Sequence, residues 1–319
     1  MAELGSGPAI GRLVFGGASI GGLYEPVSEE LALATLTAAW DAGVRAIDTA
    51  PHYGVGLSER RIGEFLAGRP RHEFTVSTKV GRLLVPAAGR VRGGPGGRFP
   101  PVEECDDFYG TPAFSRVRDY TRDGVRRSVE ESLARLRLDR IDLALIHDPD
   151  DCLPQAADET YPALAELRGQ GVIGAIGAGM NHADPLAWLI ARTDLDCVMV
   201  AGRYTLLDQS AATSLFPLCM ERGVRVLAAS VFNSGILAGG DRYNYAPAAP
   251  EILARVRQIS EICSRYEIPV AAAALWYVLR HPAVSAAVVG ARTPEEIRTD
   301  AGYLDLDIPE ALFADLVGG

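Results

Sequence analysis

Short apolar segments alternate with longer segments of helical periodicity about eight times along the chain. The apolar segments are predicted strands, at Leu13–Ser19, Ala46–Ala50, Thr75–Val80, Ile141–His147, Val172–Gly179, Cys197–Arg203, Val224–Ser230 and Val284–Ala291. Predicted helices lie between them, including Ser28–Ala42, Glu59–Leu66, Asp123–Leu136, Tyr161–Gln170, Pro185–Ala191, Leu215–Arg222 and Pro269–Arg280. Continuously apolar strands separated by helices indicate a parallel sheet buried on both faces. Eight such units predict an α/β fold, the closed (β/α)8 TIM barrel, with residues 1–319 as a single domain.

One connection is much longer than the others. About forty residues, 81–120, follow the third predicted strand, and they include the Gly-, Pro- and Arg-rich run GRVRGGPGGRFPP. Because this segment leaves the C-terminal end of a barrel strand, where barrel active sites lie, we expect a loop that covers the substrate rather than an insertion without a role. A second long stretch, Phe232–Pro250, follows the seventh strand and is expected to act in the same way.

Composition excludes several classes of protein. The chain has 319 residues, a formal net charge of -10 and a pI near 5.1, which argue against nucleic acid or an anionic membrane surface as a partner. Its five cysteines are scattered, with no Cys/His pairing of the zinc type, and no run of 18 apolar residues occurs. We expect a cytoplasmic protein with reduced thiols and no metal. The oligomeric state stays open.

Lys79 is the only lysine among the 31 lysine and arginine residues. A chain so rich in arginine would supply arginine wherever a permanent cation is enough. Lysine differs in being a compact charge whose pKa moves on burial, a property that acid–base sites use. Lys79 also ends an apolar strand, so we interpret it as a buried functional ammonium rather than a chance surface residue.

Three further polar residues lie close to strand ends and are expected at the same mouth of the barrel. Asp48 ends the second strand, Tyr53 follows it in the next loop, and His147 ends the fourth. Taken singly, they fit a helix cap, a rim aromatic and a core imidazole. Together they form a unit, because an ammonium at Lys79 would lower the pKa of a tyrosine, Asp48 would balance that ammonium, and a histidine would bind a substrate oxygen.

With these residues in place, the chain resembles the aldo-keto reductase superfamily. The resemblance is carried by DTAPHYG at Asp48, TK at Lys79, the IH strand end at His147 and VVGARTPEEI near the C-terminus, and it covers nearly the whole chain. It implies a nicotinamide cofactor across the barrel mouth and a catalytic tetrad of Asp48, Tyr53, Lys79 and His147. The segment GAGMNH lacks a third glycine and is on the fifth strand, so it is a weak dinucleotide motif.

The resemblance also implies a set of cofactor contacts. They are Gly17, Ala18, Asn181, Ser230, Phe232, Asn233, Ser234, Gly235, Leu237, Gly290, Arg292, Thr293, Glu296 and Asp300. Two positions depart from the family pattern. A glutamine that holds the carboxamide is replaced by Ala201, leaving Asn181 as the candidate, and the aromatic that stacks on the nicotinamide is replaced by Ala229. Phe232 is our substitute for that aromatic, with loop packing as its alternative explanation.

The segment from Gly290 to Glu296 bears on the choice of cofactor. Members that prefer NADPH carry basic residues at the positions of Gly290 and Glu296. A carboxylate there repels a 2′-phosphate and can accept a hydrogen bond from a free 2′-hydroxyl, so NAD is favoured. NADP remains open because the guanidinium of Arg292 could bind the phosphate. Glu296 also suits the first turn of a helix through the helix dipole.

Several phrases resemble a narrower group, the aldose 1-dehydrogenases that act on L-fucose and related sugars, with pyridoxal 4-dehydrogenase as a near relative. They include LVFGGASIGGLY, YTRDGVRRSVEESLARL, IDLALIHDPD and GRYTLLDQ. The resemblance implies oxidation of the anomeric carbon of an aldose of the L-fucose, D-arabinose or L-galactose type to a lactone. Oxidation of pyridoxal, or general aldehyde and ketone reduction, is the alternative within the family.

Three readings from other classes stay open. The run HDPDD at His147–Asp151 could bind a divalent metal, although that leaves Tyr53 and Lys79 unused. Lys79 could form a Schiff base, as in barrel aldolases. A non-catalytic binding subunit is the third reading, and the intact tetrad argues against it.

Overall fold

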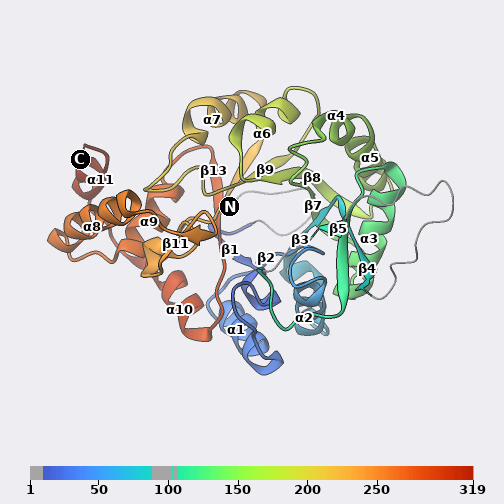
Figure 1. Ribbon diagram of the computed structural model, residues 1–319, viewed down its shortest axis with the longest axis horizontal. Coiled ribbons are helices and arrows are strands. Elements are labelled where there is room, and N and C mark those ends of the chain that lie inside the picture. Colours follow the sequence, from blue (N-terminus) through green and yellow to red (C-terminus); the bar gives the residue numbers. More distant parts are fainter. Residues whose placement is uncertain (1–9, 88–101, 104–106, 319) are drawn as a thin grey trace.

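Within the described residues, eight parallel strands close into a barrel. The computed structural model describes residues 10–87, 102–103 and 107–318. The barrel strands are β1 (Leu13–Gly16), β2 (Ala46–Asp48), β3 (Thr75–Val80), β7 (Ile141–His147), β8 (Ile173–Met180), β9 (Cys197–Ala201), β10 (Arg225–Ala229) and β13 (Val284–Val289). They pair in the order β1-β13-β10-β9-β8-β7-β3-β2 (Figure 1). The predicted (β/α)8 barrel is therefore confirmed.

Helices surround the strands, as Figure 1 shows. They are α1 (Glu29–Asp41), α2 (Leu57–Leu66), α3 (Arg122–Leu136), α4 (Leu153–Gln155), α5 (Tyr161–Gly169), α6 (Ala183–Ile190), α7 (Ala211–Arg222), α8 (Pro250–Arg265), α9 (Val270–Leu279), α10 (Pro294–Gly302) and α11 (Glu310–Gly318). The Ser28 hydroxyl caps α1 by accepting a hydrogen bond from the Leu31 amide at 3.2 Å. Helices α8 and α11 pack against each other beside α9. No described helix is long and apolar enough to cross a membrane.

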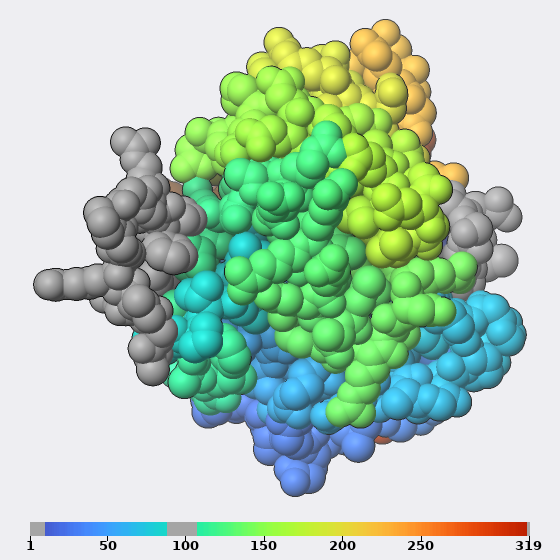
Figure 2. All heavy atoms as spheres, turned by 90° about the vertical axis from the view of Figure 1, so that its right-hand side faces the viewer, coloured from blue at the N-terminus to red at the C-terminus, as the bar shows by residue number. Residues whose placement is uncertain are grey.

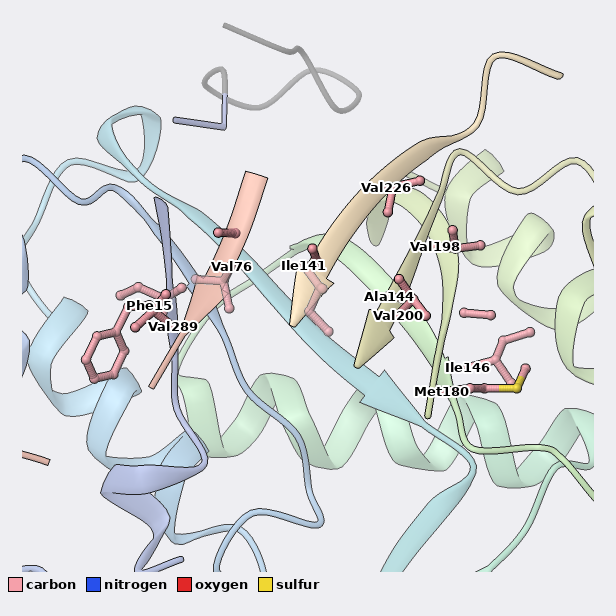
Figure 3. Packing of buried hydrophobic residues seen from close by; sticks show 14 of the residues in the cluster. Phe15, Val76, Ile141, Ala144, Ile146, Met180, Val198, Val200, Val226 and Val289 are labelled. Atoms are coloured by element: carbon pink, nitrogen blue, oxygen red, sulfur yellow. The ribbon is translucent and has the colours of Figure 1, made fainter. Parts of the chain in front are cut away.

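Side chains on the barrel strands alternate between two cores, as a period of two requires. Outward-facing residues pack against the helices, and Figure 3 shows several of them, including Phe15, Val76, Ile146, Val198 and Val289. The residues between them fill the barrel interior, as Val14, Leu143, Leu145, Met199, Leu227 and Val288 do. This alternation decides which residues at the strand ends point into the barrel.

The insert after the third strand contains a small antiparallel sheet, where we expected a loop throughout residues 81–120. Its strands are β4 (Arg82–Pro86), β5 (Val102–Glu103) and β6 (Phe114–Arg118), paired in the order β4-β6-β5. The run GRVRGGPGGRFPP lies outside the described residues. Figure 2 shows this side of the molecule, where cyan and green atoms of the insert adjoin the green atoms of α3. The described part of the insert thus adds a small sheet to one side of the barrel mouth.

The second long stretch, Phe232–Pro250, forms a 3-10 turn, η5 (Ile236–Ala238), and a two-stranded hairpin, β11 (Arg242–Tyr243) with β12 (Ala246–Pro247). The first strand is shorter than predicted, because Ser19–Gly21 forms another 3-10 turn, η1. The insert and this second long stretch both lie after the C-terminal ends of barrel strands, and both contribute to the cavity described next.

Candidate active site

A cavity of about 1060 Å³ opens at the C-terminal ends of the barrel strands. Asp48, Tyr53, Lys79 and His147 all line it. Asp48 and His147 end β2 and β7, and Lys79 is the second-last residue of β3. The alternation of the two cores places these three side chains inward, because the residues before them, Ile47, Thr78 and Ile146, face outward. The sequence prediction that the four side chains meet at one mouth matches this geometry.

Lys79 and Asp48 form a buried ion pair, and each is 2% exposed. The Lys79 ammonium donates to Asp48 Oδ2 at 2.6 Å and to the Thr49 carbonyl at 3.0 Å, while the Ser77 hydroxyl donates to Asp48 Oδ1 at 2.7 Å. Burial lowers the pKa of Lys79, but Asp48 and Tyr53 more than offset this and the pKa is raised. The only lysine of the chain therefore stays charged.

Tyr53 lies against this pair, with its ring centroid 4.6 Å from the Lys79 nitrogen. Burial raises the pKa of Tyr53 to about 12, and the Lys79 charge acts in the opposite direction without reversing the shift. The expectation of a lowered pKa was therefore wrong: Lys79 lowers the pKa of Tyr53 as expected, but the net shift is upward. The free-energy cost of desolvating the phenolate exceeds the stabilisation that the neighbouring ammonium provides. Tyr53 is a phenol at neutral pH.

His147 faces Tyr53 with ring centroids 6.0 Å apart. Burial lowers the pKa of His147 well below its usual value, and the charges of Arg82 and Lys79 lower it further. Its Nε2 is 3.5 Å from Asp148 Oδ2, and Nδ1 has no hydrogen-bond partner among the described residues. A neutral imidazole carries one N–H, so His147 can donate one hydrogen bond to a substrate oxygen.

An aromatic wall beside the tetrad was not identified from the sequence. His52 and Phe108 line the cavity, and their rings lie 5.5 Å apart and nearly perpendicular. Phe108 also stacks on Tyr53 at 6.1 Å. Tyr24 and Tyr245 line the cavity as well. His52 stands inside the DTAPHYG motif, but Phe108 comes from the insert, and no local signal in the sequence connects the two.

Most of the cofactor contacts implied by the sequence line the same cavity. They are Ala18, Asn181, Ser230, Phe232, Ser234, Gly235, Gly290, Arg292, Thr293, Glu296 and Asp300. The cavity also reaches Ala201 and Ala229, the two positions that depart from the family pattern. Phe232 additionally packs against the core, so it has both of the environments that we considered.

Gly17, Asn233 and Leu237 do not line the cavity. The Gly17 amide donates to the Asp48 carbonyl at 2.7 Å, and a Cβ at Gly17 would lie 2.6 Å from the Ser58 hydroxyl. Asn233 donates to the Gly202 carbonyl at 3.4 Å, and Leu237 is 1% exposed. These three residues support the cavity wall from behind.

Arg292 and Glu296 are engaged with protein groups. The Arg292 guanidinium pairs with Glu25 at 3.0 Å, across the cavity rim. Glu296 accepts from the Arg292 amide at 2.7 Å, and the Thr293 hydroxyl caps α10 by accepting from the Glu296 amide at 3.2 Å. Glu296 thus serves the helix start, as its position in the first turn suggested. Its side chain still borders the cavity.

The acidic run after His147 forms no metal centre. Its three aspartates pair with separate basic side chains: Asp148 with Arg82 at 3.2 Å, Asp150 with His182 at 2.7 Å and Asp151 with Arg118 at 2.8 Å. The described part of the chain holds no group of three His, Cys, Asp or Glu side chains able to bind a metal ion. The structure gives the metal-dependent reading no support.

Comparison with known proteins defines the class to which this barrel belongs. The model of the Aldo/keto reductase family matches residues 12–317, and the chain belongs to that family. It is 44% identical to the D-threo-aldose 1-dehydrogenase of a Pseudomonas species over 321 residues, which covers 99% of this chain and 95% of that protein. Identity to the pyridoxal 4-dehydrogenase of Microbacterium luteolum is 38% over 327 residues, covering 98% and 94% of the two chains.

Solved structures agree with the fold. The glycerol dehydrogenase of Gluconobacter oxydans superimposes with a TM-score of 0.76 at 24% identity, over 98% of this chain and 92% of that one. At this identity the likeness supports the barrel fold alone. The family match, by contrast, makes the protein an oxidoreductase of a family whose enzymes use NAD(P)H.

Proposed function

We propose that the protein is an aldose 1-dehydrogenase that prefers NAD and oxidises the anomeric carbon of a sugar of the L-fucose, D-arabinose or L-galactose type to the lactone. The observation that carries the proposal is the buried Lys79–Asp48 pair beside Tyr53 in a large cavity. The 44% identity to a D-threo-aldose 1-dehydrogenase supports the same substrate class.

The residues present fit a nicotinamide cofactor. Small residues lie at or near the C-terminal ends of β8, β9 and β10, the three strands that follow β7 around the barrel. A Cβ built on Gly179 would lie 3.9 Å from the Lys79 side chain. Gly179, Ala201 and Ala229 thus keep open the floor of a cavity that extends to Asp300. Its volume of about 1060 Å³ is at the upper end of ligand pockets, which suits a ligand much longer than a simple aldehyde.

The chain's own residues account for the proton chemistry. Oxidation removes a hydride from the anomeric carbon and a proton from its hydroxyl, and a bound oxidised nicotinamide supplies the hydride acceptor. Tyr53, as phenolate, accepts the proton. Lys79 stays charged beside it and stabilises that phenolate. Asp48 holds the ammonium in place and is itself held by a hydrogen bond from the Ser77 hydroxyl. His147 donates to the reacting oxygen and orients it.

This assignment predicts how the rates depend on pH. The pKa of Tyr53 is raised to about 12, so the proton-accepting phenolate is a minor form that increases about tenfold per pH unit below that value. Oxidation is therefore expected to rise with pH between about 7 and 10, whereas the reverse reduction, which needs the phenol, changes little. Steady-state kcat/KM in both directions measures this. A flat oxidation profile would contradict the role of Tyr53 as base.

The part of the cavity lined by residues 290–300, where the family resemblance would put the adenosine ribose, supports NAD over NADP. Glu25, Glu296 and Asp300 border it, and Arg292 is paired with Glu25. Burial and the charge of Glu296 raise the pKa of Asp300 to about 7. An added 2′-phosphate would meet these carboxyl groups while the nearby guanidinium is already paired.

Glu296→Arg is expected to shift preference toward NADP by about 10- to 100-fold, the equivalent of one charge-assisted hydrogen bond of about 1.5–3 kcal/mol. The ratio of kcat/KM for NAD and NADP measures the shift. Glu296→Gln is the matched control, because its amide oxygen can still accept from the Arg292 amide, and it should move the ratio less. An unchanged ratio in the arginine variant would place the 2′-position elsewhere.

Pyridoxal oxidation is the second candidate, favoured by the aromatic wall of His52, Phe108 and Tyr245 and by the 38% identity to a pyridoxal 4-dehydrogenase. The Schiff-base aldolase is disfavoured, because a nucleophilic lysine must lose its proton and the pKa of Lys79 is raised. The assembled tetrad also argues against a non-catalytic binding subunit.

One screen separates these candidates. The purified protein is assayed with NAD or NADP against L-fucose, D-arabinose, L-galactose, pyridoxal and simple aldehydes. Sugar oxidation at the highest kcat/KM supports the proposal, and a preference for pyridoxal supports the second candidate. Borohydride treatment with substrate tests the aldolase, since a covalent adduct on Lys79 would require a Schiff base.

A further inference from the structure

His52 borders the cavity beside the tetrad, and the proton chemistry above does not use it. Its ring centroid lies 5.5 Å from that of His147, 5.5 Å from that of Phe108 and 6.1 Å from that of Tyr53, each in an edge-to-face arrangement. The imidazole is therefore held between three rings next to the reacting centre.

One nitrogen of His52 is bound to the insert. Arg116, on β6, has Nη1 3.1 Å from His52 Nδ1. A guanidinium can only donate, so Nδ1 must be the acceptor. Arg116 is itself 4% exposed, which keeps this hydrogen bond away from bulk water. In a neutral imidazole that accepts at Nδ1, the proton is on Nε2.

His52 stays neutral at and around neutral pH. Burial lowers its pKa to about 2, and the charges of Arg82, Arg116 and Lys79 act in the same direction. The imidazole thus has one proton and one tautomer. No hydrogen bond from Nε2 to another group occurs within the described chain, and the ring borders the cavity, so this N–H is the donor left for a ligand.

We propose that His52 binds the substrate through its Nε2–H, which donates to a sugar hydroxyl near the reacting carbon, and that Arg116 is a positioning residue that holds the required tautomer. This inference rests on the proposed sugar oxidation and deepens it. A donor left unpaired by a substrate without that hydroxyl is costly, so His52 favours hydroxylated substrates over plain aldehydes. The insert then has a role in specificity, since it supplies both Arg116 and Phe108.

The tautomer is tested without turnover, by ¹⁵N spectroscopy of protein labelled at its five histidines. The His52 signals are assigned by their loss in His52→Phe. They are expected to show the Nε2–H form between about pH 6 and 9, and Arg116→Met should give a mixture of tautomers. Arg118→Met is the matched control, because Arg118 is on the same strand and pairs with Asp151 instead. An Nδ1–H form, or one unaffected by Arg116→Met, would overturn the role of Arg116.

Substrate binding is tested with His52→Phe, which keeps an aromatic ring. KM for the best sugar is expected to rise about tenfold or more, with a smaller change in kcat and little change for a plain aldehyde. Among monodeoxy analogues of that sugar, the one that lacks the bound hydroxyl should be a poor substrate for the wild type. Its kcat/KM should fall no further in His52→Phe. His72→Phe, at an exposed histidine outside the cavity, is the control.

The outcomes separate the two proposals. A wild-type protein that oxidises no sugar would refute the proposed function. Sugar oxidation that His52→Phe leaves unchanged, or equal losses for sugars and plain aldehydes, would refute the binding role of His52 while the proposed function stands.

Discussion

Replacing Tyr53 by phenylalanine is expected to lower kcat by about 100- to 10,000-fold, the range that proton transfer by a positioned side chain contributes. The hydroxyl is the proton carrier. The ring is retained, so its contacts with Phe108 at 6.1 Å and His147 at 6.0 Å persist. Cofactor affinity should change little, because the phenol group is not proposed as a cofactor ligand.

The measurement combines kcat for sugar oxidation with the dissociation constant of NAD(H) and the thermal midpoint. Loss of turnover with unchanged cofactor affinity and midpoint supports the assignment. Substantial turnover in Tyr53→Phe would mean that another group carries the proton, and the tetrad would have to be reassigned.

The barrel was predictable because its signal is local and repeated. Each strand is a short, largely apolar segment that contains β-branched residues. Alternate positions such as Leu145 and Ile146 pack into different cores. The insert was not, because the residues that pair are far apart in the chain. Leu83 of β4 is opposite Val117 of β6, with the Gly- and Pro-rich run between them. A composition rich in Gly and Pro predicts a loop, so the short antiparallel sheet formed by the flanking residues could not be predicted from it.

The candidate site was likewise predictable only in part. Lys79 stood out as the only lysine, and strand-end positions placed it beside Asp48 and His147. The sequence could not weigh burial against charge, so the direction of the pKa shift of Tyr53 was mispredicted. It also could not show that Arg116 reaches His52, 64 residues away, because that contact depends on how the insert folds.

Lys79→Arg tests whether position 79 needs an ammonium or only a positive charge. Arginine stays protonated and retains a charge for Asp48, so a purely electrostatic role predicts near-normal activity. The Lys79 ammonium, however, occupies a site with fixed acceptors at 2.6 Å (Asp48 Oδ2) and 3.0 Å (the Thr49 carbonyl) and is 2% exposed. A broader, planar guanidinium cannot keep both contacts without displacing the Tyr53 hydroxyl, and a shift of about 1 Å can cost about a hundredfold in rate.

We therefore expect Lys79→Arg to lose about a hundredfold or more in kcat while the thermal midpoint stays close to that of the wild type, because the barrel core lies beneath the pair. Lys79→Met is the contrasting variant. It leaves Asp48 buried without its cation, which typically costs about 3–5 kcal/mol, so it should lose both activity and stability. If Lys79→Arg kept most of its kcat, the sole lysine would be an accident of composition. If it lost activity only together with its fold, Lys79 would be structural and the argument for a stabilised Tyr53 phenolate would lose its support.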